Sequence, residues 1–416
     1  MNNRNFVFRT VTLVWLAMCI LGALPYIFSG TLGAIDALFE SISGFTTTGL
    51  TVVKNPEALP LWLLVFRSFT HWIGGMGVIA LLLAILPRLG GSPAQLLSAE
   101  SPGPVKGKTV AITRQAAKSL YAIYFVITAL LFVMLCAGGM PVADAVIHTF
   151  STVGTGGFSA KGLSIMHYDS AYITAVITVF MMLCSVNFNL YYLILIRKLK
   201  GLGQSEELRW LFGIYAVAVG LITLLLIPHY GGALPALSQA AFHSASAMST
   251  TGFFASDFGV WPAAAKTILI GLMFIGGSAG STAGGFKVAR ILLLCKSAKQ
   301  ELEKLLRPTA VNIARLDGKA VSENAIRSAN SYLVFYVLIL FFSTVIVSFD
   351  KYSFETAFLT VVSAVNNIGL CWGELGASGN LSGFGILSKF ILMFGMLLGR
   401  LEIYPLLMAV YGLRRK

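Results

Sequence analysis

Long uncharged stretches recur along the chain and are separated by polar or charged segments. They cover residues 10–35, 119–143, 170–196, 210–256 and 328–349. Each one reaches or exceeds the about 20 residues that an α-helix needs to cross the hydrocarbon of a bilayer. The pattern therefore predicts an all-α polytopic membrane protein.

Shorter, half-apolar stretches lie between the long ones. They cover residues 34–45, 141–153, 234–248 and 353–365. Each holds only about a dozen residues, which is too few to cross a bilayer. Because each follows one long apolar span and precedes another, we expect a re-entrant helix that enters the membrane and turns back.

The passages that end these short stretches form a fourfold repeat. All four are rich in serine, threonine, asparagine and glycine, and they align without gaps at two positions. The aligned serines are Ser43, Ser151, Ser246 and Ser363, and the aligned glycines are Gly49, Gly157, Gly252 and Gly369. Self-similarity at a nearly constant period indicates a repeat architecture.

The repeating unit reads as a helix, a short pore helix, a loop and a second helix. We expect four such units, at residues 1–90, 91–200, 201–300 and 301–416, with a glycine-rich intramembrane loop at 276–285 in the third. The predicted fold is thus four pseudo-symmetric helix–pore loop–helix repeats, with eight full spans and four re-entrant pore helices around one central ion pore.

Composition supports the membrane assignment, and the placement of charge predicts the topology. Hydrophobic residues make up 56% of the chain and charged residues 11%, against about 25% charged in soluble domains. This excludes disorder, a fibrous protein and a cytosolic enzyme. Most of the 30 Lys and Arg residues fall in alternate loops and in both tails, so the positive-inside rule predicts cytoplasmic termini. These basic residues lack the aromatic interleaving of a nucleic-acid surface, and no nucleic-acid partner is expected.

Cysteine and histidine spacings indicate core residues. The five cysteines show no C-x-x-C spacing and the five histidines no H-x-x-x-H spacing, which disfavours a metal centre. No cluster of His, Asp or Glu and no Ser-His arrangement suggests catalysis. We therefore expect neither an enzyme nor a cofactor.

The four loops have the composition of an ion filter. Irregular backbone at membrane depth is tolerated only where protein buries it or water lines it, and a ring of main-chain carbonyls can replace the hydration shell of a small cation such as K⁺. Glycine's access to positive φ lets successive carbonyls face one way. The candidate filter residues are Thr46, Thr47, Thr48, Gly49, Gly154, Thr155, Gly156, Gly157, Ser249, Thr250, Thr251, Gly252, Asn366, Asn367, Ile368 and Gly369.

A run of small residues interrupts the second long helix of the third unit. It consists of Gly276, Gly277, Ser278, Ala279, Gly280, Ser281, Thr282, Ala283, Gly284 and Gly285. The run lacks the G-K-[S/T] ending of a phosphate loop. Two readings stay open: close helix packing through small residues spaced four apart, or a break in the helix below the filter.

Arg400 is the second gate candidate. An arginine inside an apolar helix is costly unless it faces water, a carboxylate or a pore. Below the filter it would oppose cation passage, and the alternative is a structural pairing with a carbonyl or carboxylate. Arg67 and Lys287 lie near the edges of spans, where such side chains commonly snorkel to the interface.

The chain resembles the Trk/Ktr/HKT superfamily of cation transporters over essentially its whole length. The motifs that carry the resemblance, besides the filter loops, are residues 71–77, 99–104, 276–287 and 399–402. They are most like the bacterial TrkH type. Relative to that type we expect an extra N-terminal helix pair to be lacking before the first pore unit, a feature shared with Ktr subunits.

The resemblance implies a function and partners. It implies potassium as the preferred ion, because plant members with serine at the first filter glycine are sodium-selective and all four positions here are glycine. It also implies that the 276–285 run is a movable loop obstructing the pore, and it implies a bacterial inner-membrane location, a homodimer and a cytosolic nucleotide-binding regulatory ring. Residues 296–327 form either a solvated amphipathic helix or part of the contact with that ring.

Several details of transport stay open at this point. Each loop has one shared glycine where the T-V-G-Y-G filter has two, so we expect a shorter, less symmetric filter. The amides of Asn366 and Asn367 either contribute hydrogen bonds to the ion path or brace the fourth loop. Channel-like potassium uptake is favoured, with Na⁺- or H⁺-coupled symport or poorly selective K⁺/Na⁺ transport as alternatives. A secondary transporter of organic solutes is a more distant alternative, because such transporters usually consist of inverted repeats whereas the four repeats here share one orientation.

Overall fold

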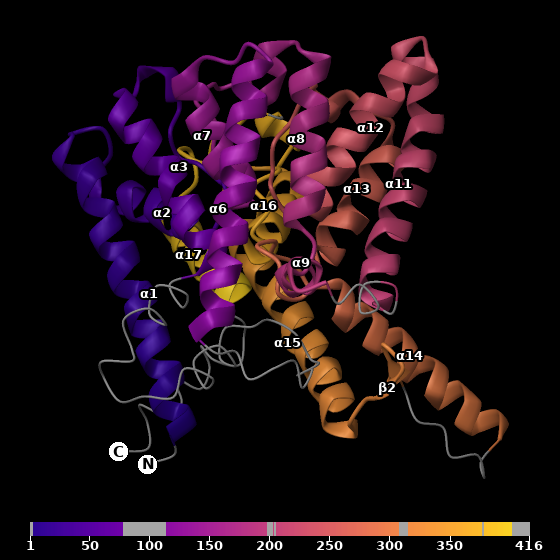
Figure 1. Ribbon diagram of the computed structural model, residues 1–416. Coiled ribbons are helices and arrows are strands. Elements are labelled where there is room, and N and C mark those ends of the chain that lie inside the picture. Colours follow the sequence, from indigo (N-terminus) through magenta and orange to yellow (C-terminus); the bar gives the residue numbers. More distant parts are fainter. Residues whose placement is uncertain are drawn as a thin grey trace.

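The computed structural model describes residues 3–77, 114–197, 203, 205–307, 315–376 and 378–401. Of the features named above, the motif at residues 99–104, the last residue of the motif at 399–402 and the basic C-terminal tail lie outside these ranges. Within them the chain is mostly helical (Figure 1). A two-residue hairpin, β1 (Arg315–Leu316) and β2 (Lys319–Ala320), pairs Arg315 with Ala320 and Leu316 with Lys319.

The helices fall into four similar groups. Unit one holds α1 (Asn3–Phe28), α2 (Ala34–Phe45) and α3 (Leu61–Met76), and unit two holds α6 (Arg114–Ala137), α7 (Val142–Val153), α8 (Ala171–Cys184) and α9 (Phe188–Leu195). Unit three holds α11 (Glu206–Tyr230), α12 (Ala233–Met248), α13 (Ala263–Ile275) and α14 (Val288–Leu306). Unit four holds α15 (Glu323–Val347), α16 (Phe354–Asn366) and α17 (Ile386–Leu401). A short 3₁₀ turn follows the loop of each unit, at Pro56–Ala58, Ser164–Tyr168, Phe258–Val260 and Gly373–Leu375.

The four short helices confirm the predicted pore-helix segments to within a residue at each end. α2, α7, α12 and α16 end where the threonine-, asparagine- and glycine-rich passages begin. Serine hydroxyls start several of the other helices, since Ser170, Ser205 and Ser322 each accept a main-chain N–H of the first turn. Local capping chemistry therefore sets many of the helix boundaries.

In the described part of the chain, the first helix of each unit is a long apolar span. Among the described residues, α1, α6, α11 and α15 are long and apolar enough to cross a membrane, and α8 with α9 would count as a fifth if taken as one span. The second helices α3, α8, α13 and α17 have 16, 14, 13 and 16 residues. α8 meets α9 at a bend of 88°, and α13 stops at Ile275 before α14 begins. Not every span expected from the apolar runs is one straight helix.

The units pack against one another in a closed ring. The second helix of each unit contacts the short helix of the next: α3 on α7, α8 on α12, α13 on α16, and α17 back on α2. Large apolar side chains stay exposed on the first helices, including Leu13, Phe125, Leu224 and Phe341. Such a surface suits a lipid environment, and the ring leaves the four loops at its centre.

Candidate functional site

Each short helix ends in the same hydrogen-bonded turn. The residue before the filter glycine donates its N–H to the carbonyl of the aligned serine: Thr48 to Ser43 at 2.9 Å, Gly156 to Ser151 at 2.8 Å, Thr251 to Ser246 at 3.0 Å and Ile368 to Ser363 at 3.0 Å. A second bond, from the residue before that to the carbonyl three residues earlier, closes a four-residue turn in every unit. This is the Schellman pattern, and it explains why the spacing from serine to glycine is constant.

The turn places a residue with positive φ at one aligned position in every loop. These residues are Thr47, Thr155, Thr250 and Asn367, with φ of 54°, 54°, 56° and 54°. The left-handed region is uncommon for β-branched residues, so three threonines there represent stored backbone strain. Strain of this kind concentrates at functional sites.

The four filter glycines lie against one another in a closed ring. All have positive φ, at 80° for Gly49, 81° for Gly157, 84° for Gly252 and 88° for Gly369. A β-carbon at each would approach a main-chain oxygen of the next loop: Gly49 that of Gly156 at 2.0 Å, Gly157 that of Thr251 at 2.0 Å, Gly252 that of Ile368 at 1.9 Å, and Gly369 that of Thr48 at 2.6 Å. The last contact returns to unit one, so the loops surround a common centre.

The predicted filter residues are therefore brought together. The threonine, serine and asparagine members are all fully buried within the protein. Hydroxyl pairs link alternate positions inside two loops, since Thr46 and Thr48 lie 2.8 Å apart and Ser249 and Thr251 lie 2.7 Å apart. The loops are held by internal bonds as well as by their neighbours.

The two asparagines of the fourth loop hydrogen-bond to neighbouring segments. Asn367 donates through Nδ2 to the hydroxyl of Thr48 at 2.9 Å and to the carbonyl of Met396 at 2.8 Å. Asn366 accepts from the hydroxyl of Tyr336 at 2.8 Å. Of the two roles left open for these amides, the described contacts support bracing, and Asn367 joins the fourth loop to the first.

The glycine-rich run does break the helix. α13 ends at Ile275, the following Gly276 has a φ of 71°, and the chain stays irregular until α14 begins at Val288. Gly280 and Gly285 also have positive φ, at 78° and 81°. The reading of the run as continuous helix packing is therefore wrong, because these conformations cannot belong to an α-helix.

The irregular segment touches two filter loops and the bend of unit two. Gly284 donates its N–H to the hydroxyl of Thr250 at 2.6 Å, and Gly285 donates to the carbonyl of Asn366 at 3.0 Å. Ser278 donates to the carbonyl of Ser185 at 2.9 Å, at the bend between α8 and α9. The segment thus lies directly against the loops of units three and four.

Arg400 ties this segment to unit one. Its Nη1 donates to the carbonyl of Thr282 at 2.9 Å, and its Nη2 donates to the carbonyls of Gly74 and Gly75, the latter at 2.9 Å. These partners are main-chain oxygens, as in the structural alternative set out above. The same contacts connect the candidate gate loop to the end of α3, so the two gate candidates form one assembly.

Two basic residues expected to snorkel are buried instead. Lys287 is 3% exposed and its Nζ donates to the carbonyl of Ala283. Arg67 is 2% exposed and forms an ion pair with Glu40, Nε to Oε1 at 2.6 Å. The expectation of interfacial positions is wrong because each side chain finds a partner inside the protein.

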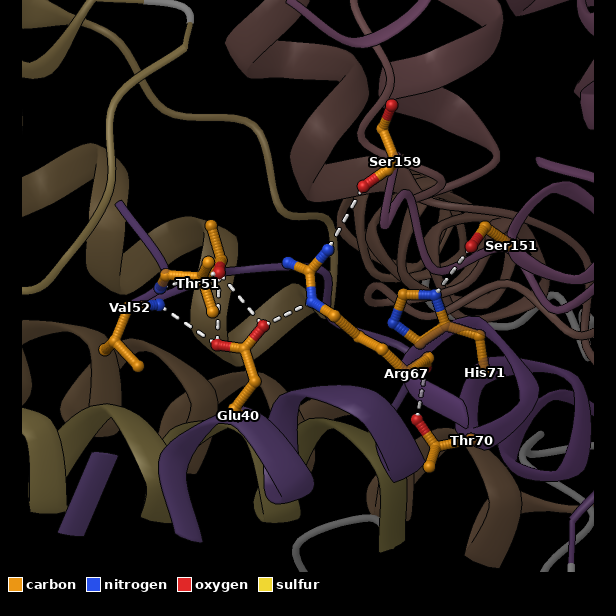
Figure 2. A network of polar contacts seen from close by, with 9 residues as sticks. Glu40, Thr51, Val52, Arg67, Thr70, His71, Ser151 and Ser159 are labelled. Carbon is orange, nitrogen blue, oxygen red and sulfur yellow. Dashed lines mark hydrogen bonds and ion pairs between the residues drawn. The ribbon is translucent and has the colours of Figure 1, made fainter. Parts of the chain in front are cut away.

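Glu40 is a site residue that the sequence reasoning missed. Its carboxylate accepts from the hydroxyl of Thr51 at 2.9 Å and from the N–H of Val52 at 3.0 Å, just beyond the first filter loop (Figure 2). Arg67 reaches in the other direction to the carbonyl of Ser159 at 3.3 Å, beyond the second loop. The sequence did offer a signal for this pair, because an acidic residue stands inside the short apolar helix α2 and a basic residue stands inside the next helix, α3.

The cysteines and histidines behave largely as core residues. Cys19, Cys184 and Cys371 are buried, and Cys295 is exposed. Within the described part of the chain, no group of three or more His, Cys, Asp or Glu side chains is arranged to hold a metal ion.

Comparison with known proteins places the chain among transporters. A family model described as TrkH, cation transport protein, matches residues 4–412. The Trk system potassium uptake protein TrkH of Salmonella typhimurium is 38% identical over 406 residues, covering 96% of this chain and 84% of its own. Its counterpart in Escherichia coli strain K12 is 37% identical with the same coverage. The crystal structure of the potassium transporter TrkH from Vibrio parahaemolyticus superposes with a TM-score of 0.88 at 32% identity, covering 100% of this chain and 86% of that one.

Proposed function

Because the chain belongs to the TrkH family of cation transport proteins, we propose that it takes up potassium ions through a pore at the centre of its four units. The observation that carries this proposal is the closed ring in which each filter glycine abuts a main-chain oxygen of the next loop. A ring of carbonyls can take the place of water around K⁺ as the ion enters. An inside-negative potential adds about 2.3 kcal/mol per 100 mV for one charge, which suffices for passive accumulation.

The filter would consist of the four loops already named, one from each unit. The unit boundaries at residues 1–90, 91–200, 201–300 and 301–416 are part of the proposal, supported by the cyclic packing of second helix on short helix. The four units lie in one orientation around the ring rather than as two inverted halves. That arrangement disfavours a secondary transporter of organic solutes.

The segment at 276–285 and Arg400 would form the gate. The segment lies against the loops of units three and four, and Arg400 holds it to the end of α3. A guanidinium next to the ion path also repels cations in a region of low dielectric constant. Opening would require the segment to leave Thr250 and Asn366 while Arg400 releases the carbonyl of Thr282.

The cellular setting is proposed on the same basis. We place the protein in a bacterial inner membrane with both termini cytoplasmic, as the distribution of Lys and Arg favours. α14 projects from the helical bundle (Figure 1) and exposes Leu302, Leu305 and Leu306. This surface would meet a cytosolic nucleotide-binding regulatory ring, and the protein would act as a homodimer.

Flux into proteoliposomes tests the transport proposal. The purified protein is reconstituted with K⁺ inside, and uptake of rubidium is followed with and without external Na⁺. We expect uptake above protein-free vesicles, driven by the potassium gradient alone and weakly inhibited by Na⁺. Rubidium uptake that needs a sodium or proton gradient would replace passive conduction by coupled symport, and equal passage of Na⁺ would remove the claim of potassium preference.

A further inference from the structure

One position on each short helix lies behind the filter of its own unit. It is the residue three before the aligned serine, occupied by Glu40, His148, His243 and Thr360. All four side chains are fully buried. A buried polar side chain requires hydrogen-bond partners, and those partners reveal what the position does.

In three units the side chain accepts a hydrogen bond from the chain segment that follows the filter glycine, which we call the outgoing limb. Glu40 accepts from the N–H of Val52 at 3.0 Å. The Nε2 of His243 accepts from the N–H of Ala255 at 3.4 Å. Ala255 in unit three aligns with Val52 in unit one. Equivalent bonds at equivalent places make this a repeated feature of the ring rather than an isolated contact.

His148 makes the corresponding bond through a side chain. Its Nε2 lies 3.0 Å from the hydroxyl of Ser159, and Ser159 aligns with Thr51, whose hydroxyl donates to Glu40 in unit one. The Nδ1 atoms of both histidines lie close to a carbonyl one turn earlier, Asp144 at 2.8 Å and Gln239 at 2.9 Å. Because a carbonyl only accepts, each Nδ1 carries the proton and each Nε2 is left as the acceptor.

Unit four departs from this pattern. The hydroxyl of Thr360 donates to the carbonyl of Thr356 in its own helix at 2.7 Å. Thr356, one turn earlier, instead accepts from the N–H of Glu374 at 3.1 Å. Among the described contacts of unit four, the side chain of Thr360 therefore makes no hydrogen bond to the outgoing limb. Unit four thus supplies an internal control.

Arg67 connects the hydrogen-bonded limbs of units one and two. Its Nε pairs with Glu40 and its Nη1 donates to the carbonyl of Ser159 (Figure 2). Its guanidinium carbon also lies 3.6 Å from the centre of the Phe158 ring. The first and second limbs are thus fixed relative to each other by one side chain. Moving either limb would break a buried charge-assisted bond, which is among the stronger hydrogen bonds in proteins.

We infer that Glu40, His148 and His243 are positioning residues that hold the filter limbs from behind and thereby determine how well the pore discriminates K⁺ from Na⁺. This inference rests on the proposed function. A carbonyl ring distinguishes ions through the number and spacing of its oxygens. A limb freed from its anchor lets those oxygens relax toward the smaller ion, so discrimination falls even where ions still pass.

The test compares His243→Asn with His243→Gln. Asparagine keeps a donor near the position of Nδ1 for the carbonyl of Gln239 but has no acceptor that reaches Ala255, whereas glutamine extends an acceptor toward the limb. The readout is the ratio of K⁺ to Na⁺ permeability in proteoliposomes. A loss of folded protein lowers both fluxes together and leaves this ratio unchanged. We expect His243→Asn to lower the ratio several-fold and His243→Gln to restore most of it.

His148→Asn and His148→Gln repeat the comparison in unit two, and Thr360→Val is the matched control in unit four. The control should keep the wild-type ratio. Folded asparagine variants with a wild-type ratio, or a fall in Thr360→Val as large as that in His243→Asn, would overturn the inference while leaving potassium transport intact. A wild-type protein that passes no potassium would overturn the proposed function and this inference with it.

Discussion

Arg400 and Thr282 are joined by a hydrogen bond of 2.9 Å between a guanidinium nitrogen and a main-chain oxygen. The bond connects α17 of unit four to the irregular segment of unit three, and the same guanidinium reaches the end of α3 in unit one. Three units are therefore linked through one charged side chain. Any movement of the segment away from the filter loops must first break or carry along this contact.

Replacing Arg400 by alanine should raise the basal ion flux. The substitution removes both the charge beside the proposed path and the bonds that hold the segment. Hydrogen bonds to charged groups contribute about 1.5–3 kcal/mol each, and 1.4 kcal/mol corresponds to about a tenfold change in an equilibrium. We expect rubidium uptake to rise about tenfold, measured without any regulatory subunit.

Arg400→Lys serves as the partner variant. It keeps the positive charge but loses the fork that contacts several carbonyls at once, so its uptake should fall between the wild type and Arg400→Ala. If folded Arg400→Ala takes up rubidium at the wild-type rate, the arginine has only a structural role.

Thr250→Val should also loosen the segment. The hydroxyl of Thr250 accepts from the N–H of Gly284 at 2.6 Å, and valine has nearly the same shape without an acceptor. A buried N–H left without its partner costs about 1–3 kcal/mol, which shifts the segment away from the loop. Basal rubidium uptake is the measurement, and it should increase.

Thr267→Val is the control for that substitution. Thr267 lies on α13, is exposed, and bonds only within its own helix. Its uptake should match that of the wild type. Lowered rather than raised uptake in Thr250→Val would assign the hydroxyl to the ion path instead of to the gate.

The junction between units four and one should depend on a partly buried ion pair. Lys389 and Asp36 lie 2.8 Å apart, with side-chain exposures of 8% and 33%. The pair between Lys266 and Glu355, near the junction of units three and four, is longer at 4.0 Å and more exposed. Exposed pairs contribute about 0–1 kcal/mol, whereas removing one partner of a buried pair costs about 3–5 kcal/mol.

Lys389→Met should therefore lower the melting temperature in detergent clearly more than Lys266→Met does. Asp36 retains some contact with solvent, so the loss should lie below the upper end of that range. Comparable melting temperatures for the two variants would show that the fourth junction is held by apolar packing alone.

The sequence predicts the short helices and the alignment of their glycines because both follow from local patterns. A dozen half-apolar residues followed by a Schellman turn leave a constant spacing, visible at Ser43 and Gly49 as at Ser363 and Gly369. The ring closure and the break at Gly276 also agree with the pattern of small residues. These features depend on short segments whose chemistry is repeated.

The features that escaped prediction depend on contacts between distant segments. From the sequence alone Arg67 is expected at the membrane interface, and only the structure shows its ion pair with Glu40 on α2. The bend after Cys184 has no glycine or proline to mark it, and it coincides with the bond from Ser278 to the carbonyl of Ser185. The left-handed threonines run against the preference of β-branched residues, so local propensity predicts the wrong conformation at Thr47, Thr155 and Thr250.

Gly157→Ser tests the filter ring itself. Serine there meets two obstacles, since φ is 81° and its β-carbon would lie 2.0 Å from the carbonyl oxygen of Thr251. The second obstacle cannot be relieved without moving the neighbouring loop, and that movement displaces an oxygen of the proposed ring. We expect the ratio of K⁺ to Na⁺ permeability to fall several-fold in proteoliposomes.

Gly139→Ser separates the two obstacles. Gly139 has nearly the same φ of 83°, but nothing lies within 4 Å of the position where its β-carbon would be. This variant should carry the backbone strain, about 1 kcal/mol, and keep the wild-type permeability ratio. An equal loss of selectivity in both variants would mean that general destabilisation produces the effect. A wild-type ratio in folded Gly157→Ser would show that the contact between the second and third loops does not govern ion choice.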